Sequence, residues 1–184
     1  VLAMHMNTAH NTAAALPLLT EVLNHATVGT TEHQSALLTQ ALALQSSGDM
    51  GAAIKTYRDM LATYADQPTA LNNLAYLLVQ CDPPLSAPAE ALKYAERLRS
   101  RMTADAQAAA ALDTIGWVYF KNGKNDLAAA ALEEAIGLGG PAASVNLHLG
   151  QVYQAQGRLA EARAVLTQAL DLARQASQED EARQ

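Results

Sequence analysis

The sequence predicts an all-α protein, an α-solenoid in which antiparallel helix pairs stack in series. Three observations support this fold class. Hydrophobic residues make up 50% of the 184 residues but aromatic residues only 4%, so much of the apolar content is alanine, the strongest helix former. Apolar residues recur at helical spacing along most of the chain. A pattern of small and large apolar residues over 112–141 returns 34 residues later, and self-similarity at such a period indicates a repeat architecture.

The two most regular units predict the same elements in the same order. Each has a first helix, a turn at a glycine (Gly123 or Gly157) and a second helix. In the unit that contains Gly123, we expect Thr103 to cap the first helix and Asn125 to cap the second. Such side chains accept hydrogen bonds from free N–H groups at a helix start. The matching positions are Leu112 and Asn146, Ile115 and Leu149, Gly116 and Gly150, Tyr119 and Tyr153, Ala128 and Ala162, and Leu132 and Leu166.

Weaker copies of the pattern precede these two units, so we expect residues 1–184 to form a single repeat domain. The first copy has a short first helix, from which we expect the chain to be cut from a longer protein or to begin at a processing site. Residues 26–33 are expected to be a linker broken at Gly29, and Gly48 is expected to turn the next unit. The expected units are 1–30 (a partial repeat), 34–67, 68–104 with an enlarged proline-rich loop at 80–88, 105–142 and 143–176. They are followed by a polar tail at 177–184, which is either a frayed end or, as its helix-forming composition favours, an extension of the last helix.

Composition and motifs argue against several classes of function. The net charge is −6 and no concentrated basic face is predicted, which disfavours nucleic acid as a partner. No apolar run reaches the roughly 20 residues that span a bilayer. The single Cys81 excludes an internal disulfide framework, and the five histidines lack the spacing of metal ligands. Glu133-Glu134 is interpreted as a solvated helix face. We therefore predict no catalytic residue, cofactor or metal site.

The units resemble tetratricopeptide repeats, in which W-x₂-L-G-x₂-Y is followed by A-x₃-F and a proline. In this chain the pattern becomes Leu112-x₂-Ile115-Gly116-x₂-Tyr119, then Ala128-x₃-Leu132 and Pro141. The resemblance covers nearly the whole chain and looks bacterial. It implies a right-handed superhelix with a concave groove, in which glycine or alanine lets paired helices cross closely.

The same resemblance implies that the first helix of each pair lines the groove. Trp117 could anchor a bound peptide there, or it could pack against the neighbouring helix; both interpretations stay open. Asn73 could likewise hold a peptide backbone or bond to a neighbouring helix. Among the predicted groove residues, lysine occurs only at Lys121, so the cationic clamp with which some family members grip a C-terminal carboxylate is not reproduced. The predicted groove residues are Asn72, Asn73, Tyr76, Asp113, Thr114, Trp117, Phe120, Lys121, His148, Gln151 and Gln154.

These features favour a non-catalytic scaffold that binds a peptide or protein in the concave groove. Two alternatives remain: a structural spacer or self-assembly segment, which could associate through an open N-terminal repeat, and a regulatory domain of a larger multidomain protein. The sequence is compatible with both a cytoplasmic and a periplasmic location, and it does not identify the partner.

Overall fold

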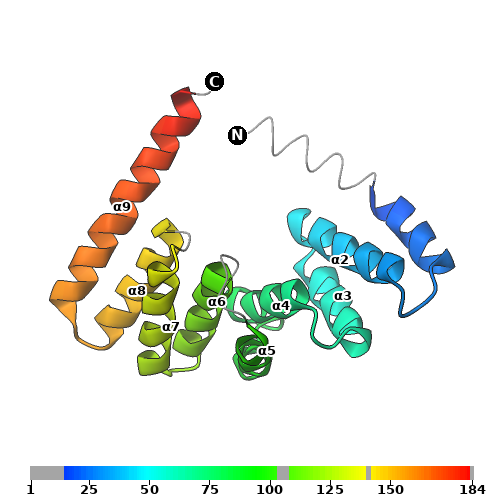
Figure 1. The fold of residues 1–184 in the computed structure, drawn as a ribbon, viewed down its shortest axis with the longest axis horizontal. Coiled ribbons are helices and arrows are strands. Elements are labelled where there is room, and N and C mark those ends of the chain that lie inside the picture. Colours follow the sequence, from blue (N-terminus) through cyan, green and yellow to red (C-terminus); the bar gives the residue numbers. More distant parts are fainter. Residues whose placement is uncertain (1–14, 103–107, 140–141, 183–184) are drawn as a thin grey trace. The chain divides into compact units, whose positions relative to one another are not determined.

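A computed structural model describes residues 15–102, 108–139 and 142–182, in which all regular secondary structure is α-helical (Figure 1). The chain divides into unit 1 (Val1–Ala87) and unit 2 (Pro88–Gln184), and each is described by itself. Unit 1 contains a helical segment over residues 15–25, then α2 (Thr31–Ser46), α3 (Met50–Thr63) and α4 (Pro68–Gln80). Unit 2 contains α5 (Pro88–Arg101), α6 (Ala108–Lys121), α7 (Asn125–Gly137), α8 (Ala142–Ala155) and α9 (Leu159–Ala182).

Helices that follow one another in the chain pack side by side within each unit. In unit 1, α3 packs on both α2 and α4. In unit 2, each helix from α5 to α8 packs on the next, and α6 also contacts α8. Short connections make these neighbours antiparallel, as Figure 1 shows for α6 and α7. The predicted all-α solenoid is confirmed.

The predicted glycine turns are confirmed by their backbone angles. Gly48, Gly123 and Gly157 have φ values of 87°, 72° and 74°. This left-handed region is open to glycine at little cost and is strained for residues that carry a Cβ atom. Each of the three glycines therefore ends a first helix and lets the chain reverse into the second helix of the pair.

Two expected helix starts were wrong by a few residues. The linker expected over 26–33 is shorter, because α2 already begins at Thr31, and the Thr30 side chain accepts a hydrogen bond from the His33 backbone N–H. Asn125 is the first residue of α7 rather than its cap, and Lys124 holds the cap position without a side-chain bond. Thr103, the other expected cap, lies outside the described residues.

Small residues lie where paired helices cross, as the repeat pattern predicts. A Cβ atom added to Gly116 would lie 2.6 Å from Leu132 Cγ, and one added to Gly150 would lie 2.5 Å from Leu166 Cγ. Neither distance leaves room for a carbon–carbon contact, which needs about 3.5–4.0 Å. The alanines at the equivalent small positions are also buried: Ala41, Ala53, Ala75, Ala91, Ala128 and Ala162.

Polar side chains bridge neighbouring helices at the surface of unit 2. The Tyr153 hydroxyl donates to Glu133 at 2.7 Å, and Arg99 of α5 pairs with Glu134 of α7 at 2.6 Å. The Glu133 and Glu134 side chains are 50% and 47% exposed, as expected for a solvated face, and both carboxylates also join α7 to other helices. The polar residues near the C-terminus continue α9 as far as Ala182, which confirms the expected helical extension.

Candidate interaction face

Side chains from α6 and α8 meet on one face of unit 2. Asp113, Trp117 and Lys121 follow one another at a spacing of four residues, so they lie along one side of α6. The neighbouring helix α8 supplies Ser144 and His148. The α6–α8 cluster is defined by Asp113, Trp117, Phe120, Lys121, Ser144 and His148.

Asp113 holds two residues of α8 at once. Its Oδ1 lies 2.7 Å from His148 Nδ1, and its Oδ2 accepts a hydrogen bond from the Ser144 hydroxyl at 3.0 Å. An ionised carboxylate only accepts hydrogen bonds, so the proton of this contact belongs to His148 Nδ1. The side chains of Asp113 and His148 are 13% and 14% exposed, which shields the pair from water. Asp113 therefore links α6 to α8 through both of its carboxylate oxygens.

Trp117 packs between its neighbours rather than projecting into solvent. Its ring stacks on His148 with 4.3 Å between centroids and an angle of 20°, and the Phe120 centroid lies 5.4 Å away. The Lys121 ammonium lies 4.6 Å from the Trp117 centroid, at cation–π distance. Only 7% of Trp117 is exposed. Of the two interpretations of Trp117, packing against the neighbouring helix accounts for these contacts, and Phe120 and Lys121 form the accessible rim.

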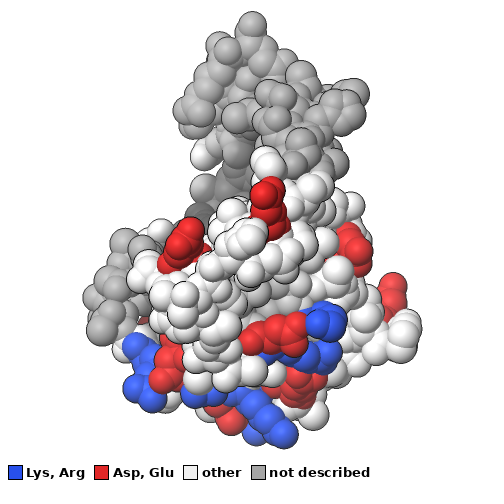
Figure 2. Space-filling view, turned by 90° about the vertical axis from the view of Figure 1, so that its right-hand side faces the viewer, with Lys and Arg blue, Asp and Glu red and all other residues white. Residues whose placement is uncertain are grey.

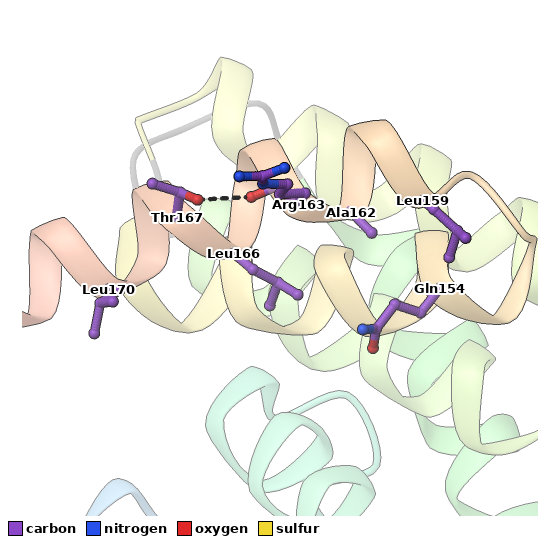
Figure 3. Close-up of a pocket in the computed structure, with 7 residues that line it drawn as sticks. All are labelled: Gln154, Leu159, Ala162, Arg163, Leu166, Thr167 and Leu170. Carbon is purple, nitrogen blue, oxygen red and sulfur yellow. Dashed lines mark hydrogen bonds between the residues drawn. The ribbon is translucent and has the colours of Figure 1, made fainter.

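The other predicted residues of unit 2 do not all join this cluster. Thr114 is buried within the unit. Gln151 is half-buried on α8, and Gln154 is exposed. Gln154 lies instead beside α9, where it lines a hollow of about 400 Å³ with residues that include Leu159 and Leu166 (Figure 3).

Two of the three predicted residues of unit 1, Asn72 and Asn73, belong to a separate chain of hydrogen bonds. Asn72 Nδ2 donates to Asn73 Oδ1 at 3.1 Å, and Asn73 Nδ2 donates to the Tyr57 hydroxyl at 3.0 Å. Tyr57 donates in turn to Gln45 Oε1 at 3.1 Å, so the chain links α4, α3 and α2. Burial raises the pKa of Tyr57, and the bond from Asn73 partly opposes this shift. Asn73 therefore bonds to a neighbouring helix, and Tyr76 is half-buried on the same helix, α4.

Sequence reasoning missed three residues that organise these two faces: Ser144, Tyr57 and Gln45. One signal was available for Ser144, because cross-repeat neighbours lie about one repeat apart and Ser144 follows Asp113 by 31 residues. Among the described residues, no group of His, Cys, Asp and Glu could hold a metal ion. None of the described helices has the length and apolarity that a membrane crossing requires.

Comparisons with known proteins identify the repeats. The sequence profile of the tetratricopeptide repeat matches residues 114–178. No curated protein sequence matches the chain at a significant level.

Several solved structures share the fold. MamA from Desulfovibrio magneticus RS-1 (residues 41 to the end) is 19% identical, with a TM-score of 0.72 over 94% of this chain and 95% of that one. PilW, a type IV pilus biogenesis factor, is 20% identical, with a TM-score of 0.74 over 94% of this chain and 75% of that one. BtubC from P. vanneervenii is 21% identical, with a TM-score of 0.72 over 91% and 75% of the two chains.

These similarities extend the repeat fold over nearly the whole chain and are consistent with a bacterial origin. Repeats of this kind are typically non-catalytic and serve as scaffolds for other proteins, because stacked helix pairs form extended binding surfaces. A protein partner therefore follows from the architecture, whereas the residues that contact it do not.

Proposed function

Because the chain is a tetratricopeptide repeat protein, we propose that it is a non-catalytic scaffold that binds an extended segment of a protein partner on the α6–α8 face of unit 2. The observation that carries this proposal is the α6–α8 cluster, in which a packed core of Asp113, Trp117 and His148 supports an accessible rim of Phe120 and Lys121.

The cluster is suited to binding because the residues that support its accessible rim are already held in place. Trp117 is fixed between His148 and Lys121, and His148 is fixed by Asp113. Ordering a long side chain on binding costs about 0.5–1.5 kcal/mol, and a preorganised surface avoids part of this cost. The Lys121 ammonium in particular is already held at cation–π distance from the Trp117 ring.

The chemistry of the rim suggests the kind of segment that fits. The half-buried Phe120 offers an apolar contact, and Lys121 offers a positive charge. We propose a segment that carries an apolar side chain next to an acidic one. For unit 1 we propose that Asn72 and Tyr76 contact the partner, while Asn73 positions Asn72.

The proposal can be tested with peptides selected on the full chain from a displayed random library. Trp117 is the only tryptophan, so its fluorescence reports directly on the α6–α8 cluster. We expect bound peptides to change its emission. We expect Phe120→Ala to weaken binding by at least about 1 kcal/mol, as is usual for a hot spot, and Lys121→Glu to weaken it further.

The matched control is Lys124→Glu, because Lys124 is also exposed but lies beyond the turn, at the start of α7. It changes the net charge by the same amount as Lys121→Glu and should leave the affinity unchanged. If the selected peptides bind both rim variants as tightly as the natural sequence and leave the Trp117 emission unaltered, the α6–α8 face is not the binding surface.

A further inference from the structure

The outer face of α9 carries an uncovered apolar surface. Leu159 and Leu170 are 67% and 50% exposed, and with Ala162 and Leu166 they surround the hollow of about 400 Å³ shown in Figure 3. Arg163 and Thr167 lie at the same hollow. Exposed leucines arranged along one helix face are typical of a surface that receives another helix.

The equivalent face of α7, one repeat earlier, is covered by another helix. Leu132 of α7 is the counterpart of Leu166, and Ala129 is the counterpart of Arg163. Leu132 and Ala129 are 0% and 4% exposed, whereas Leu166 is only half-buried and Arg163 is exposed. The difference arises because α8 packs on α7, while no described helix covers the same side of α9. Among the described helices, the α9 face therefore lacks the neighbour that packs on the equivalent face of α7.

A second hollow lies on the helical segment 15–25 of unit 1, with a volume of about 340 Å³. Leu18 and Val22, which line it, are 63% and 38% exposed. Ala26 adds to its apolar lining, and Glu21, His25 and Glu32 complete it. Leu18 and Val22 thus form a second exposed apolar face, and this face has acidic residues at its edge.

The charges at the two hollows are opposite. Arg163 lies at the α9 hollow, and Glu21 and Glu32 lie at the other; none of the three forms an ion pair with any described residue. No lysine or arginine precedes Lys55 in the sequence. In the view of Figure 2, Lys and Arg gather at the lower edge together with several acidic side chains, and isolated acidic side chains lie on the mostly uncharged surface above.

We propose that a second copy of this chain docks head to tail, with the α9 hollow of one copy against the 15–25 hollow of the next. Apolar side chains fill both hollows, and Arg163 pairs with Glu21 and Glu32 across the contact. The arrangement continues the stacking of helix on helix that holds each unit together. Because the two faces differ, the contact is heterologous and can add further copies in series.

Sedimentation velocity on the 184-residue chain tests this assembly. We expect the sedimentation coefficient to rise with protein concentration, and to rise less at high salt because salt screens the charge pairs. Arg163→Glu should raise the dissociation constant about tenfold or more, since like charges then face each other. Glu21→Arg combined with Glu32→Arg should do the same. Lys124→Glu is the matched charge control and should not change assembly.

Mixing the two kinds of variant distinguishes this contact from any other. At a concentration where the natural chain associates, a chain with Arg163→Glu and a chain with Glu21→Arg and Glu32→Arg should each be mainly monomeric. Mixed together they should associate, because each α9 face then meets an opposite charge. The same rescue is expected when all three substitutions are combined in one chain. All three positions are exposed, so circular dichroism should show unchanged helicity.

Three results would overturn the proposal. The first is a natural chain that sediments as a monomer from micromolar to millimolar concentration. The second is self-association that Arg163→Glu does not weaken, which would assign it to another face. The third is a mixture of the two variants that stays monomeric, which would exclude direct pairing of Arg163 with Glu21 and Glu32.

Discussion

Replacing Gly116 with alanine should destabilise unit 2, although alanine is the better helix former. The new Cβ atom would lie 2.6 Å and 2.9 Å from Leu132 Cγ and Cδ2, and 3.2 Å from the backbone oxygen of Ala128. Leu132 is fully buried, so it has no free space into which to move. To restore a normal carbon–carbon distance, α6 and α7 must separate by about 1 Å.

The expected cost follows from two opposing effects. Overpacking a well-filled core costs about 1–3 kcal/mol. Replacing glycine with alanine inside a helix recovers up to about 1 kcal/mol. We therefore expect a net loss of about 1–2 kcal/mol, which corresponds to a fall in melting temperature of roughly 2–8 °C for a chain of this size.

Chemical unfolding and hydrogen exchange of the α6 and α7 amides would measure this loss, and the exchange data would show whether it is local. Gly137→Ala is the matched control, because Gly137 is also helical and a Cβ atom there would meet nothing within 4 Å. It should be neutral or slightly stabilising. Adding Leu132→Ala to Gly116→Ala should cost less than the sum of the two single changes. A Gly116→Ala chain as stable as the natural one would refute the close-crossing explanation.

Three further predictions concern single residues of unit 2. Gly157→Ala places a Cβ atom at φ 74° in open space, so the strained backbone alone should lower stability, by about 1–2 kcal/mol in thermal unfolding. Burial, and then the hydrogen bond to Glu133, raise the pKa of Tyr153 from 10.0 to about 12. The folded protein then keeps a proton that the unfolded chain loses, so stability should fall as pH rises through this window, and Tyr153→Phe should flatten an alkaline unfolding curve. Asp113→Ala removes the carboxylate that bonds to both His148 and Ser144 and should cost about 1–3 kcal/mol in urea unfolding, with a shift in Trp117 emission.

The helix pairs could be predicted from the sequence because their packing imposes a periodic requirement. Every pair must cross, and a close crossing accepts only glycine or alanine on one side, as at Gly116 and Gly150. That requirement recurs with the repeat and is visible without coordinates. Element ends were less certain because a cap is set by one hydrogen bond. Thr30 could not be distinguished from its neighbour Thr31 by composition alone.

The polar contacts between repeats were missed for a different reason. The side-chain pairs that a single helix brings together lie three or four residues apart. In stacked repeats, however, partners on neighbouring units lie about one period apart. Asp113 and His148 are separated by 35 residues, and so are Arg99 and Glu134. Complementary side chains at this longer spacing would have been the useful signal.

The positions that define the repeat are separate from those that could select a partner. Between the two regular units, the small position remains glycine at Gly116 and Gly150, because both sites face a leucine at the crossing. Positions on the α6–α8 side change completely over the same interval. The pairs are Asp113 and Leu147, Trp117 and Gln151, Phe120 and Gln154, and Lys121 and Ala155. The repeat pattern therefore identifies the fold but not the partner, because packing constrains only the residues that lie between helices. Specificity must come from the positions where the units differ, which is why Phe120 and Lys121, rather than the glycines, are the substitutions that test function.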